Sequence, residues 1–581
     1  MKRYTTFILT ASILFLTACG GGKDKNELTL KEGKGGITLG GVFKVNEIET
    51  FRSLFPLTIT DVYSYRIANQ VYQSLFKFNQ ENLKVETNLA DTYEVSQDKL
   101  VYTIKLKKGV YFQDNDCFSG GKGRELKASD VKYCYDKTCE SIPQNKMYWL
   151  FKDKVVGAQE YFESSKKGTP NAEGVKGIEV VDDYTIKITL VEPFGAFDQI
   201  LAHMGTAIYP KEAFDKYGKD MRVNCVGTGP FQLKKVVEGR EVILVKNENY
   251  WEQDEHGNKL PYLDGIKVSF IPEKSTELKE FQKGNLHMIW EIPVDEIPNI
   301  IGSLDEAKEG KNAEFILQSS HSLSVQYYAF RYTHEVFNNV YVRKAFNMAI
   351  DREELVEVTL QGEGEPAFHG FVPPMEGYPQ EKVKGYTYDP NEARALLAKA
   401  GYPNGKGFPV IQLNLNSGGK TQELLAVAIM NELKKNLNVD IEVKVLPMNQ
   451  HQNEIESGRS AFWRIGWVAD YPDPENFLNL FYSKNLPENA TDDAYINSVR
   501  YTNPEFDEAF VAARRESDPV KRMELFAQAD QILMDDAVVM PLYYDDYIRL
   551  LNPQVRNFPM NSLEYRDFTR VYFAKEKKKK K

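Results

Sequence analysis

The chain has 581 residues, with 73 Lys and Arg against 83 Asp and Glu, and 42% of its residues are apolar. This composition is typical of a globular protein with two or more domains, and it excludes a disordered chain, a collagen and a small disulfide-rich scaffold. A net charge of −10, without a basic stripe interleaved with aromatic residues, argues against a nucleic-acid partner.

The first 18 residues have the pattern of a secretory signal. Lys2 and Arg3 precede an apolar run from Phe7 to Leu16, which is too short to span a bilayer as a mature helix. Small residues then lead to Cys19, and this arrangement is similar to the bacterial lipoprotein signal, in which the cysteine is lipidated and becomes the first residue. We therefore expect Cys19 to anchor the mature protein to the periplasmic or extracellular face of a bacterial membrane. The alternative is a plain secretory signal followed by an incidental cysteine.

Residues 20–41 contain eight glycines with charged residues between them, which predicts a flexible tether between the lipid and the first folded segment. At the other end, residues 575–581 are six lysines and one glutamate. This tail has no apolar residue to bury, so we expect a solvated end that could touch anionic lipid.

Half-buried strands dominate the first half of the chain. Apolar or aromatic residues alternate with polar ones in Val101–Leu106, and the same alternation runs from Tyr184 to Leu190. A period of two residues is typical of a strand with one buried face.

Four further cysteines, Cys117, Cys134, Cys139 and Cys225, allow three disulfide pairings, and the sequence does not decide among them. The first three lie in or near a loop enlarged by glycines at 120–123, where a local disulfide would hold an otherwise loose segment. No two cysteines have CxxC spacing and no two histidines are four residues apart, so no metal site and no cofactor are predicted.

Helical signals take over in the second half. Asp389 as N-cap, Pro390 at the first helical position and Gly401 past the end bracket one short helix. Residues Thr421–Leu437 form an amphipathic pattern that leads into a strand beginning at Ile441. A helix followed by a strand at this spacing is typical of α/β packing.

Five separated segments, taken in order, carry a family resemblance. They are Asn88–Ser96 with Lys108–Phe112, Val226–Phe231 continuing to Trp251, Phe337–Arg352, Tyr388–Pro403 and Gly466–Pro474. Together they resemble the family 5 extracellular solute-binding proteins, the oligopeptide- and dipeptide-binding type that delivers substrate to ABC importers. The resemblance covers almost the whole mature chain and is closest around Phe462–Tyr471.

The resemblance implies an α/β, periplasmic-binding-protein-like class II fold, in which two lobes are joined by a hinge and an extra β-rich domain is inserted. The boundaries that it implies are a signal peptide at 1–18, the lipidated cysteine and tether at 19–41, lobe I at 42–70 with 188–312 and 545–574, the inserted domain at 71–187, lobe II at 313–544 and the basic tail at 575–581.

The implied function is that of a substrate-binding lipoprotein, which captures a peptide by lobe closure and delivers it to the transmembrane subunits of an ABC permease. Such a protein is a monomer without a cofactor and without catalytic activity. Two alternatives stay open: the same fold binding an oligosaccharide, a nickel chelate or an opine, and an exported hydrolase that uses Asp470 and Asp473 as a carboxylate pair. Peptide length and sequence preference are not predicted.

The resemblance also implies a ligand site. Asp470 matches the aspartate that takes the ligand's α-ammonium, since a buried ammonium requires a carboxylate partner. Arg464, six residues earlier, matches an arginine that meets the ligand's carboxylate, for which its forked guanidinium is well suited. Without the resemblance, Asp470 would be interpreted as a turn residue and Arg464 as half of an ion pair.

Three further residues complete the predicted ligand site. Trp467 is expected to line the cleft, Tyr471 to flank Asp470, and His369 to offer a second contact to the carboxylate, its alternative being a surface histidine. Trp463 is expected to pack in the core, and Asp473 before Pro474 to cap a helix.

Overall fold

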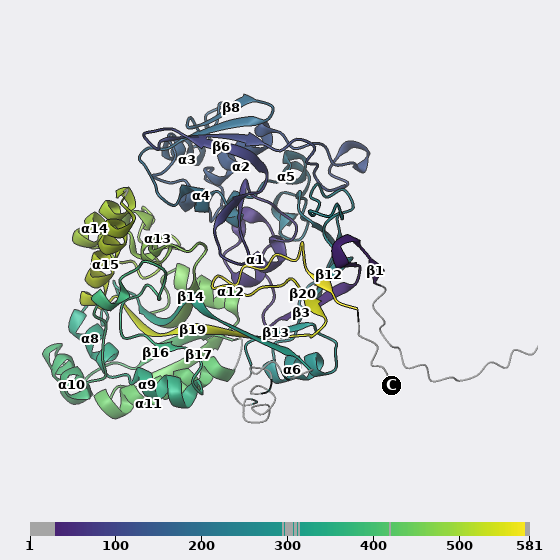
Figure 1. The fold of residues 1–581 in the computed structure, drawn as a ribbon. Coiled ribbons are helices and arrows are strands. Elements are labelled where there is room, and N and C mark those ends of the chain that lie inside the picture. Colours follow the sequence, from purple (N-terminus) through teal and green to yellow (C-terminus); the bar gives the residue numbers. More distant parts are fainter. Residues whose placement is uncertain are drawn as a thin grey trace, which may run out of the picture.

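The computed structural model describes residues 30–292, 296, 306, 311, 314–417, 420–516 and 518–575. The predicted signal segment, Cys19, residues 20–29 of the predicted tether and all of the basic tail except Lys575 lie outside these residues. The described part of the predicted tether is folded, since residues 31–32 pair with residues 38–39 as two short strands. Three larger sheets with their helices make up most of the described part, and Figure 1 shows them in separate regions of the molecule.

The first sheet combines strands from two distant parts of the chain. Its order is β10 (Phe231–Val237), β11 (Glu241–Lys246), β12 (Gly265–Phe270) and β3 (Val42–Glu47), with β3 parallel to β12 and the other pairs antiparallel. The ring of the fully buried Phe43 contacts the rings of Phe558, Phe568 and Phe573 near the C-terminus. The N-terminal and C-terminal segments therefore share one hydrophobic core.

Shorter elements accompany this sheet along the chain. They are β1 (Lys31–Glu32), β2 (Thr38–Leu39), α1 (Val62–Ala68), β4 (Phe76–Phe78), β5 (Val85–Thr87), α6 (Lys274–Gln282), β13 (Met288–Trp290), β20 (Val555–Arg556) and β21 (Tyr572–Phe573).

The second sheet is antiparallel and contains the strands predicted from alternation. Its order is β6 (Ala90–Val95), β7 (Val101–Leu106), β9 (Thr185–Thr189) and β8 (Ile178–Asp182). Strand β7 has the predicted bounds, and its apolar face, which includes Ile104, is buried against Ile186 and Ile188 of β9. Strand β9 continues across the predicted domain boundary at 187/188. The helices around this sheet are α2 (Ala128–Thr138), α3 (Ala158–Lys166), α4 (Phe197–Ile200) and α5 (Lys211–Tyr217).

The third sheet is mixed, with the order β13-β19-β14-β18-β16-β17 and β15 (Glu365–Pro366) paired to β19. Strands β16 (Ile411–Asn416), β17 (Ile441–Leu446) and β18 (Phe462–Val468) run parallel, whereas β14 (Ile316–Phe330) and β19 (Val539–Leu551) are long and antiparallel. Its helices are α8 (Val340–Met348), α9 (Arg352–Glu354), α10 (Pro390–Lys399), α11 (Lys420–Leu437), α12 (Met448–Glu456), α13 (Pro474–Leu478), α14 (Pro504–Arg515) and α15 (Pro519–Asp535).

Two of these helices match their sequence signals. Helix α10 begins at Pro390, and the side chain of Asp389 accepts hydrogen bonds from the backbone of residues 391 and 392, both at 3.0 Å. Gly401, just past its end, has a φ of +99°, which favours glycine. Helix α11 covers the predicted range and is followed by β17, so the predicted helix-to-strand unit is confirmed.

The long strands β14 and β19 connect different parts of the molecule. The N-terminal half of β14 pairs with residues 546–551 of β19, whereas its C-terminal half pairs with both β18 and residues 539–544. The register shifts between His321 and Val325. Strand β19 thus crosses the predicted boundary at 544/545, whereas the predicted boundary at 312/313 lies outside the described residues. The division into lobes at these positions stays a prediction.

The four described cysteines are free thiols, so the local disulfide considered from the sequence is not formed. Cys134 instead accepts a hydrogen bond from the backbone N–H of Tyr209 at 3.3 Å. The glycines of Gly227-Thr-Gly-Pro230 serve backbone geometry, since a Cβ at Gly227 would lie 2.1 Å from the carbonyl oxygen of Val71.

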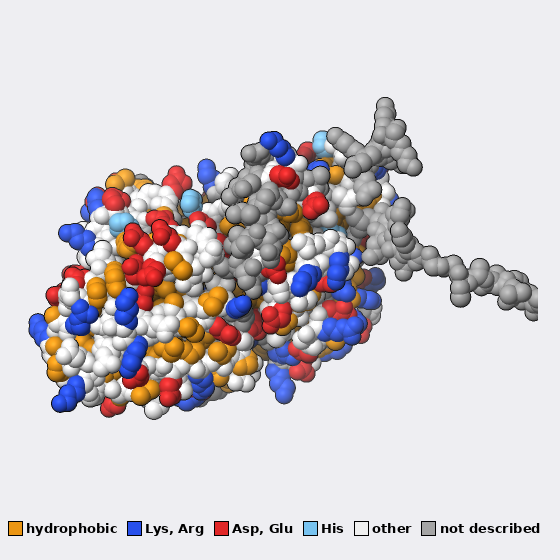
Figure 2. Space-filling view, turned by 90° about the horizontal axis from the view of Figure 1, so that it is seen from below, with side chains coloured by type: hydrophobic (Ala, Val, Ile, Leu, Met, Phe, Trp, Pro, Cys, Tyr) orange, Lys and Arg blue, Asp and Glu red, His pale blue; other side chains and the backbone are white. Residues whose placement is uncertain are grey.

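In the part of the chain that the structure describes, no helix is long and apolar enough to cross a membrane. No group of three or more His, Cys, Asp or Glu side chains there could hold a metal ion. On the face drawn in Figure 2, acidic and basic side chains are interspersed, and apolar side chains lie between them.

Candidate functional site

A cavity of about 300 Å³ lies where the three regions of the fold meet. Its walls come from segments far apart in the sequence: the end of β3 and the start of α1, the short turns at 147–149 and 203–205, helices α6 and α12, strand β18 with the residues that follow it, residues 545–547 of β19 and residues 563–565. A cavity of this volume is in the range of small-molecule sites. It is the candidate ligand site.

Asp470 lines the cavity just after the end of β18, and its side chain is 29% exposed. Its backbone N–H donates to the Oδ1 atom of Asn476 at 3.0 Å, which fixes the turn that leads into α13. The nearest basic group is the Nε2 atom of His203, 3.4 Å from the Asp470 Oδ1 atom, and within the described ranges no lysine or arginine forms an ion pair with this carboxylate. The carboxylate can therefore accept a cation from a ligand.

The charge of Asp470 affects two neighbouring phenols. Burial, and to a smaller extent the negative charge of Asp470, raise the pKa of Tyr65 and of Tyr495 well above the ordinary tyrosine value. Both side chains line the same cavity. Among the described residues, His203 is the one basic side chain within ion-pair distance of the Asp470 carboxylate.

Arg464 also lines the cavity, on β18 itself. Its guanidinium donates to the Oδ1 atom of Asn416 at 2.9 Å and to the Oε1 atom of Gln326. Both acceptors are neutral amides, and no carboxylate of the described chain lies within ion-pair distance of Arg464. The amides orient the guanidinium and leave its positive charge for a ligand carboxylate.

The amide of Gln326 links Arg464 to a carboxylate that sequence reasoning missed. Its Nε2 atom donates to the Oδ2 atom of Asp545 at 2.6 Å, and Ser324 donates to the same oxygen. Burial is the main reason that the pKa of Asp545 rises to about 6, with the nearby charge of Glu291 adding to it. Asp545 lies on β19 and no local motif marks it, because its hydrogen-bond partners lie on β14, more than 200 residues earlier in the chain.

The two tryptophans of β18 lie in different surroundings, as the sequence predicted. Trp467 is half-buried at the cavity wall, and its indole N–H donates to Asn476 at 2.9 Å. Trp463 is buried in the core and does not line the cavity.

The structure does not bring Tyr471 or His369 to this cavity. Tyr471 is fully buried, and its hydroxyl donates to Glu475. Asp470 and Tyr471 lie in the bend between β18 and α13, and this bend directs Asp470 toward the cavity and Tyr471 into the core. His369 lies elsewhere, with its Nδ1 atom 3.1 Å from the carbonyl oxygen of Val383.

Asp473 has the structural role that its position before Pro474 predicted. Its side chain accepts from the backbone N–H of Glu475 at 2.9 Å and caps α13. Arg522 holds both of its carboxylate oxygens, at 2.7 and 2.9 Å. Asp473 is not part of the cavity wall, so a catalytic pair of Asp470 and Asp473 is not assembled there.

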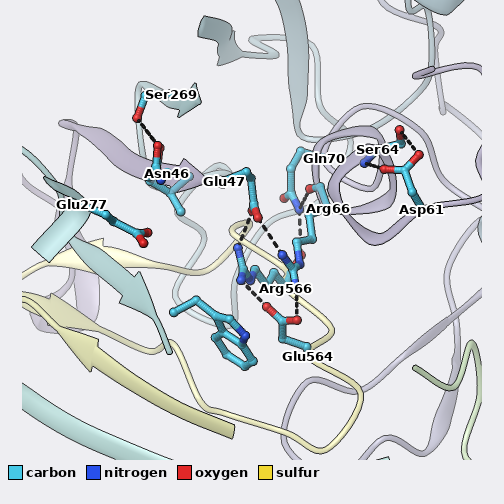
Figure 3. Close-up of polar contacts among 12 residues, drawn as sticks. Asn46, Glu47, Asp61, Ser64, Arg66, Gln70, Ser269, Glu277, Glu564 and Arg566 are labelled. Atoms are coloured by element: carbon cyan, nitrogen blue, oxygen red, sulfur yellow. Dashed lines mark hydrogen bonds and ion pairs between the residues drawn. The ribbon is translucent and has the colours of Figure 1, made fainter. Parts of the chain in front are cut away.

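A buried ring of four charges supports one side of the cavity (Figure 3). Glu47 pairs with Arg66 at 2.6 Å and with Arg566 at 2.7 Å, and Glu564 pairs with both arginines. The ring joins β3, α1 and the C-terminal segment, and the guanidinium of Arg566 lies 5.2 Å from the centre of the Trp290 ring. Because the charges balance, this ring is a support and not a free binding group.

Polar contacts also cross the rim of the cavity. Glu456 of α12 lies 3.7 Å from Arg52 and 3.0 Å from Lys146, two residues of the N-terminal third of the chain. Ser417, after β16, donates to Glu49 at 3.0 Å. These contacts hold the walls together around the enclosed space.

Comparisons with known proteins agree with this geometry. Residues 84–488 match the family described as bacterial extracellular solute-binding proteins, family 5 Middle. The glutathione-binding protein GsiB of Salmonella paratyphi A (strain ATCC 9150 / SARB42) is 30% identical over 515 residues, which cover 87% of this chain and 90% of that protein.

Two solved structures are similar over nearly their whole length. The ABC transporter-associated periplasmic binding protein DppA from Helicobacter pylori, in complex with the peptide STSA, is 26% identical with a TM-score of 0.79, covering 92% of this chain and 99% of that one. A periplasmic oligopeptide-binding protein (OppAIV) from Borrelia burgdorferi is 26% identical with a TM-score of 0.77, covering 90% and 98%. The predicted α/β, two-lobe class II fold is confirmed.

Proposed function

The chain belongs to the bacterial extracellular solute-binding proteins, family 5, and we propose that it captures peptides in the cavity for delivery to the permease of an ABC importer. In this proposal the protein acts as a monomer that encloses its ligand and performs no chemistry on it.

One observation carries the peptide assignment: the cavity wall presents a carboxylate and a guanidinium that lack strong ionic partners. Within the described ranges, His203 is the one basic group within ion-pair distance of Asp470, and Arg464 is held by two neutral amides. A peptide with free ends carries the two complementary charges, an ammonium and a carboxylate. The names of the relatives are consistent with such ligands, since one is described as binding glutathione and another was solved with the peptide STSA.

The spacing of the two groups suits a short, extended ligand. Arg464 and Asp470 are six residues apart, and at about 3.3 Å per residue their Cα atoms are separated by roughly 20 Å along the wall. Their side chains shorten this span from both ends, which leaves room for roughly three to five extended residues. Trp467, between them, offers an apolar surface to the ligand's side chains.

The first test replaces the carboxylate. Asp470→Asn keeps the shape of the side chain and removes the counter-charge of the ammonium. A hydrogen bond between charged groups contributes about 1.5–3 kcal/mol, so we expect the Kd of a free peptide such as STSA to rise roughly 10- to 150-fold. The N-acetylated peptide has no ammonium, so its Kd should be similar for the variant and the wild type. Equal losses for both peptides in calorimetric titrations would contradict the assignment of Asp470.

The mirror test uses Arg464→Gln with free and C-terminally amidated peptides. Only the peptide with a free C-terminal carboxylate should bind this variant more weakly than the wild type, because the amidated peptide has no charge there for the guanidinium to neutralise. Native mass spectrometry of the protein as purified would identify retained ligands. Incubation with peptide mixtures tests the absence of catalysis, since cleavage products would contradict a pure binding role.

We also propose that the protein is held at the membrane by lipid on Cys19, which lies outside the described residues. The support is the pattern of the signal segment, and two or three acyl chains give stable anchoring where a single chain does not. Expression of the full chain in bacteria with labelled fatty acid tests this. Label should enter the wild type and not the Cys19→Ser variant, and equal labelling of both would contradict it.

A further inference from the structure

His203 is a titratable residue that faces the predicted ammonium site from a distant part of the chain. It precedes the short turn Met204–Thr206, lines the cavity and is only 6% exposed. Its Nε2 atom lies 3.4 Å from the Oδ1 atom of Asp470. The family resemblance does not assign it a role, and 267 residues separate it from Asp470 in the sequence.

The hydrogen bonds of His203 determine which nitrogen carries the proton. Its Nδ1 atom accepts the backbone N–H of Gly205 at 2.8 Å, so in the neutral ring the proton is on Nε2, the nitrogen that faces Asp470. The edge of the Trp149 ring packs against the imidazole, with the ring centres 5.6 Å apart. The ring is therefore held in one orientation.

A second proton on this ring would have two consequences. The new N–H at Nδ1 would face the N–H of Gly205, so the turn that lines the cavity would lose its hydrogen bond. The imidazolium would also neutralise Asp470, the group that the ligand's ammonium needs. A proton on His203 and the ammonium therefore compete for one carboxylate.

Other charged groups near His203 do not replace it in this role. The phenols of Tyr65 and Tyr495 face Asp470 and stay neutral at physiological pH, because burial raises the pKa of each. Lys154 lies on the far side of Trp149, where it donates to the carbonyl oxygen of that residue at 3.0 Å. Helix α2 also packs against the turn, and its charged side chains pair with one another, with Arg124 or with Glu140. The turn at 56–58, which packs there too, carries no titratable side chain.

We infer that His203 is a positioning residue that makes ligand capture proton-linked: peptides with a free ammonium bind when the imidazole is neutral, and binding expels a proton from it when the imidazole is charged. This inference rests on the proposed function. It predicts that the affinity for peptides with a free ammonium falls on acidification, and that this fall depends on His203.

The test measures the Kd of STSA by calorimetry from pH 5 to pH 7 with the mature protein, a range in which the α-ammonium of the peptide stays charged. In the wild type, the Kd should rise on acidification by up to tenfold per pH unit, because one proton competes with one ammonium. The variant His203→Gln cannot take up this proton and should keep a nearly constant Kd over the same range. As a matched control, His321→Gln changes an exposed histidine that is not part of the cavity wall, and it should follow the wild type.

A second measurement needs no variant. Titrations of the wild type at pH 6 in buffers with different ionisation enthalpies count the protons released on binding, and free STSA should release more than N-acetylated STSA. If the wild type binds STSA but His203→Gln retains the same pH profile, or if no protons are released, the role of His203 is refuted while the proposed function stands. If the wild type binds STSA at no pH, the proposed function fails and this inference with it.

Discussion

The buried ring of Glu47, Arg66, Glu564 and Arg566 allows a sharp test of what holds the cavity wall together. Replacing Arg566 by methionine preserves much of the apolar stem and removes one of the two cations. The side chain of Arg566 is 2% exposed, and both carboxylates that it contacts are buried. The change would leave two buried negative charges to share Arg66 alone.

The expected cost follows from this burial. Removing one partner of a buried ion pair destabilises a protein by about 3–5 kcal/mol, because the remaining charge stays away from water without compensation. Arg66 still contacts both carboxylates, so we expect the lower end of this range, about 3 kcal/mol. Arg570→Met is the matched control: that side chain is 40% exposed and pairs with Glu252 and Glu255, so the loss should be below about 1 kcal/mol.

Urea unfolding, followed by tryptophan fluorescence, measures the difference, and Trp290 beside Arg566 makes the signal sensitive to this region. A double variant, Glu564→Gln with Arg566→Met, separates charge from packing. If Arg566→Met destabilises the protein because Glu564 is left as a buried charge with too few partners, neutralising Glu564 should recover part of the lost stability. The reasoning is refuted if Arg566→Met shifts the unfolding midpoint no more than Arg570→Met, or if the second substitution only adds to the loss.

Three further predictions concern pH, closure and backbone packing. Burial, with Lys44 nearby, lowers the pKa of His287 to about 4. The contribution of the neutral imidazole to folding stability is therefore fully present above about pH 6.5, and up to about 3 kcal/mol of it is lost as the pH falls to 4. In a plot of the urea midpoint against pH, His287→Asn should flatten this region, and parallel curves for variant and wild type would contradict the prediction. Glu456→Gln weakens the contacts of this residue with Arg52 and Lys146 across the rim. Peptide dissociation should then be about five- to tenfold faster in stopped-flow experiments, and an unchanged rate would show that these contacts do not retain the ligand. Gly227→Ala places a Cβ 2.1 Å from the carbonyl oxygen of Val71. The free energy of unfolding, measured with urea, should fall by about 1–3 kcal/mol. A variant as stable as the wild type would show that the two backbone segments can move apart without cost.

Local structure could be predicted from the sequence because its causes are local. The alternation in Val101–Leu106 and the cap at Asp389 each involve residues within one turn or one strand, and the structure confirms both. The packing of Trp463 and the capping role of Asp473 were likewise predictable from residue type and a neighbouring proline. The resemblance placed Asp470 and Arg464, and both line the cavity.

Contacts between distant segments could not be predicted in this way. Tyr471 was expected beside the ligand because it adjoins Asp470, yet the bend between β18 and α13 directs the two side chains differently, and only the packed fold shows that Tyr471 enters the core. Asp545 was not predicted because its hydrogen-bond partners come from β14, which is distant in the sequence.

The sequence by itself therefore determined the strands, the capped helices and, through its family pattern, two charged residues that line the cavity. The tertiary structure alone decided that His203 lies against Asp470 and that Glu47 meets Arg566, 519 residues away. The physical reason is that a buried charge is stable only with a partner, and folding supplies that partner from whatever segment packs beside it, at a sequence separation that no local period encodes.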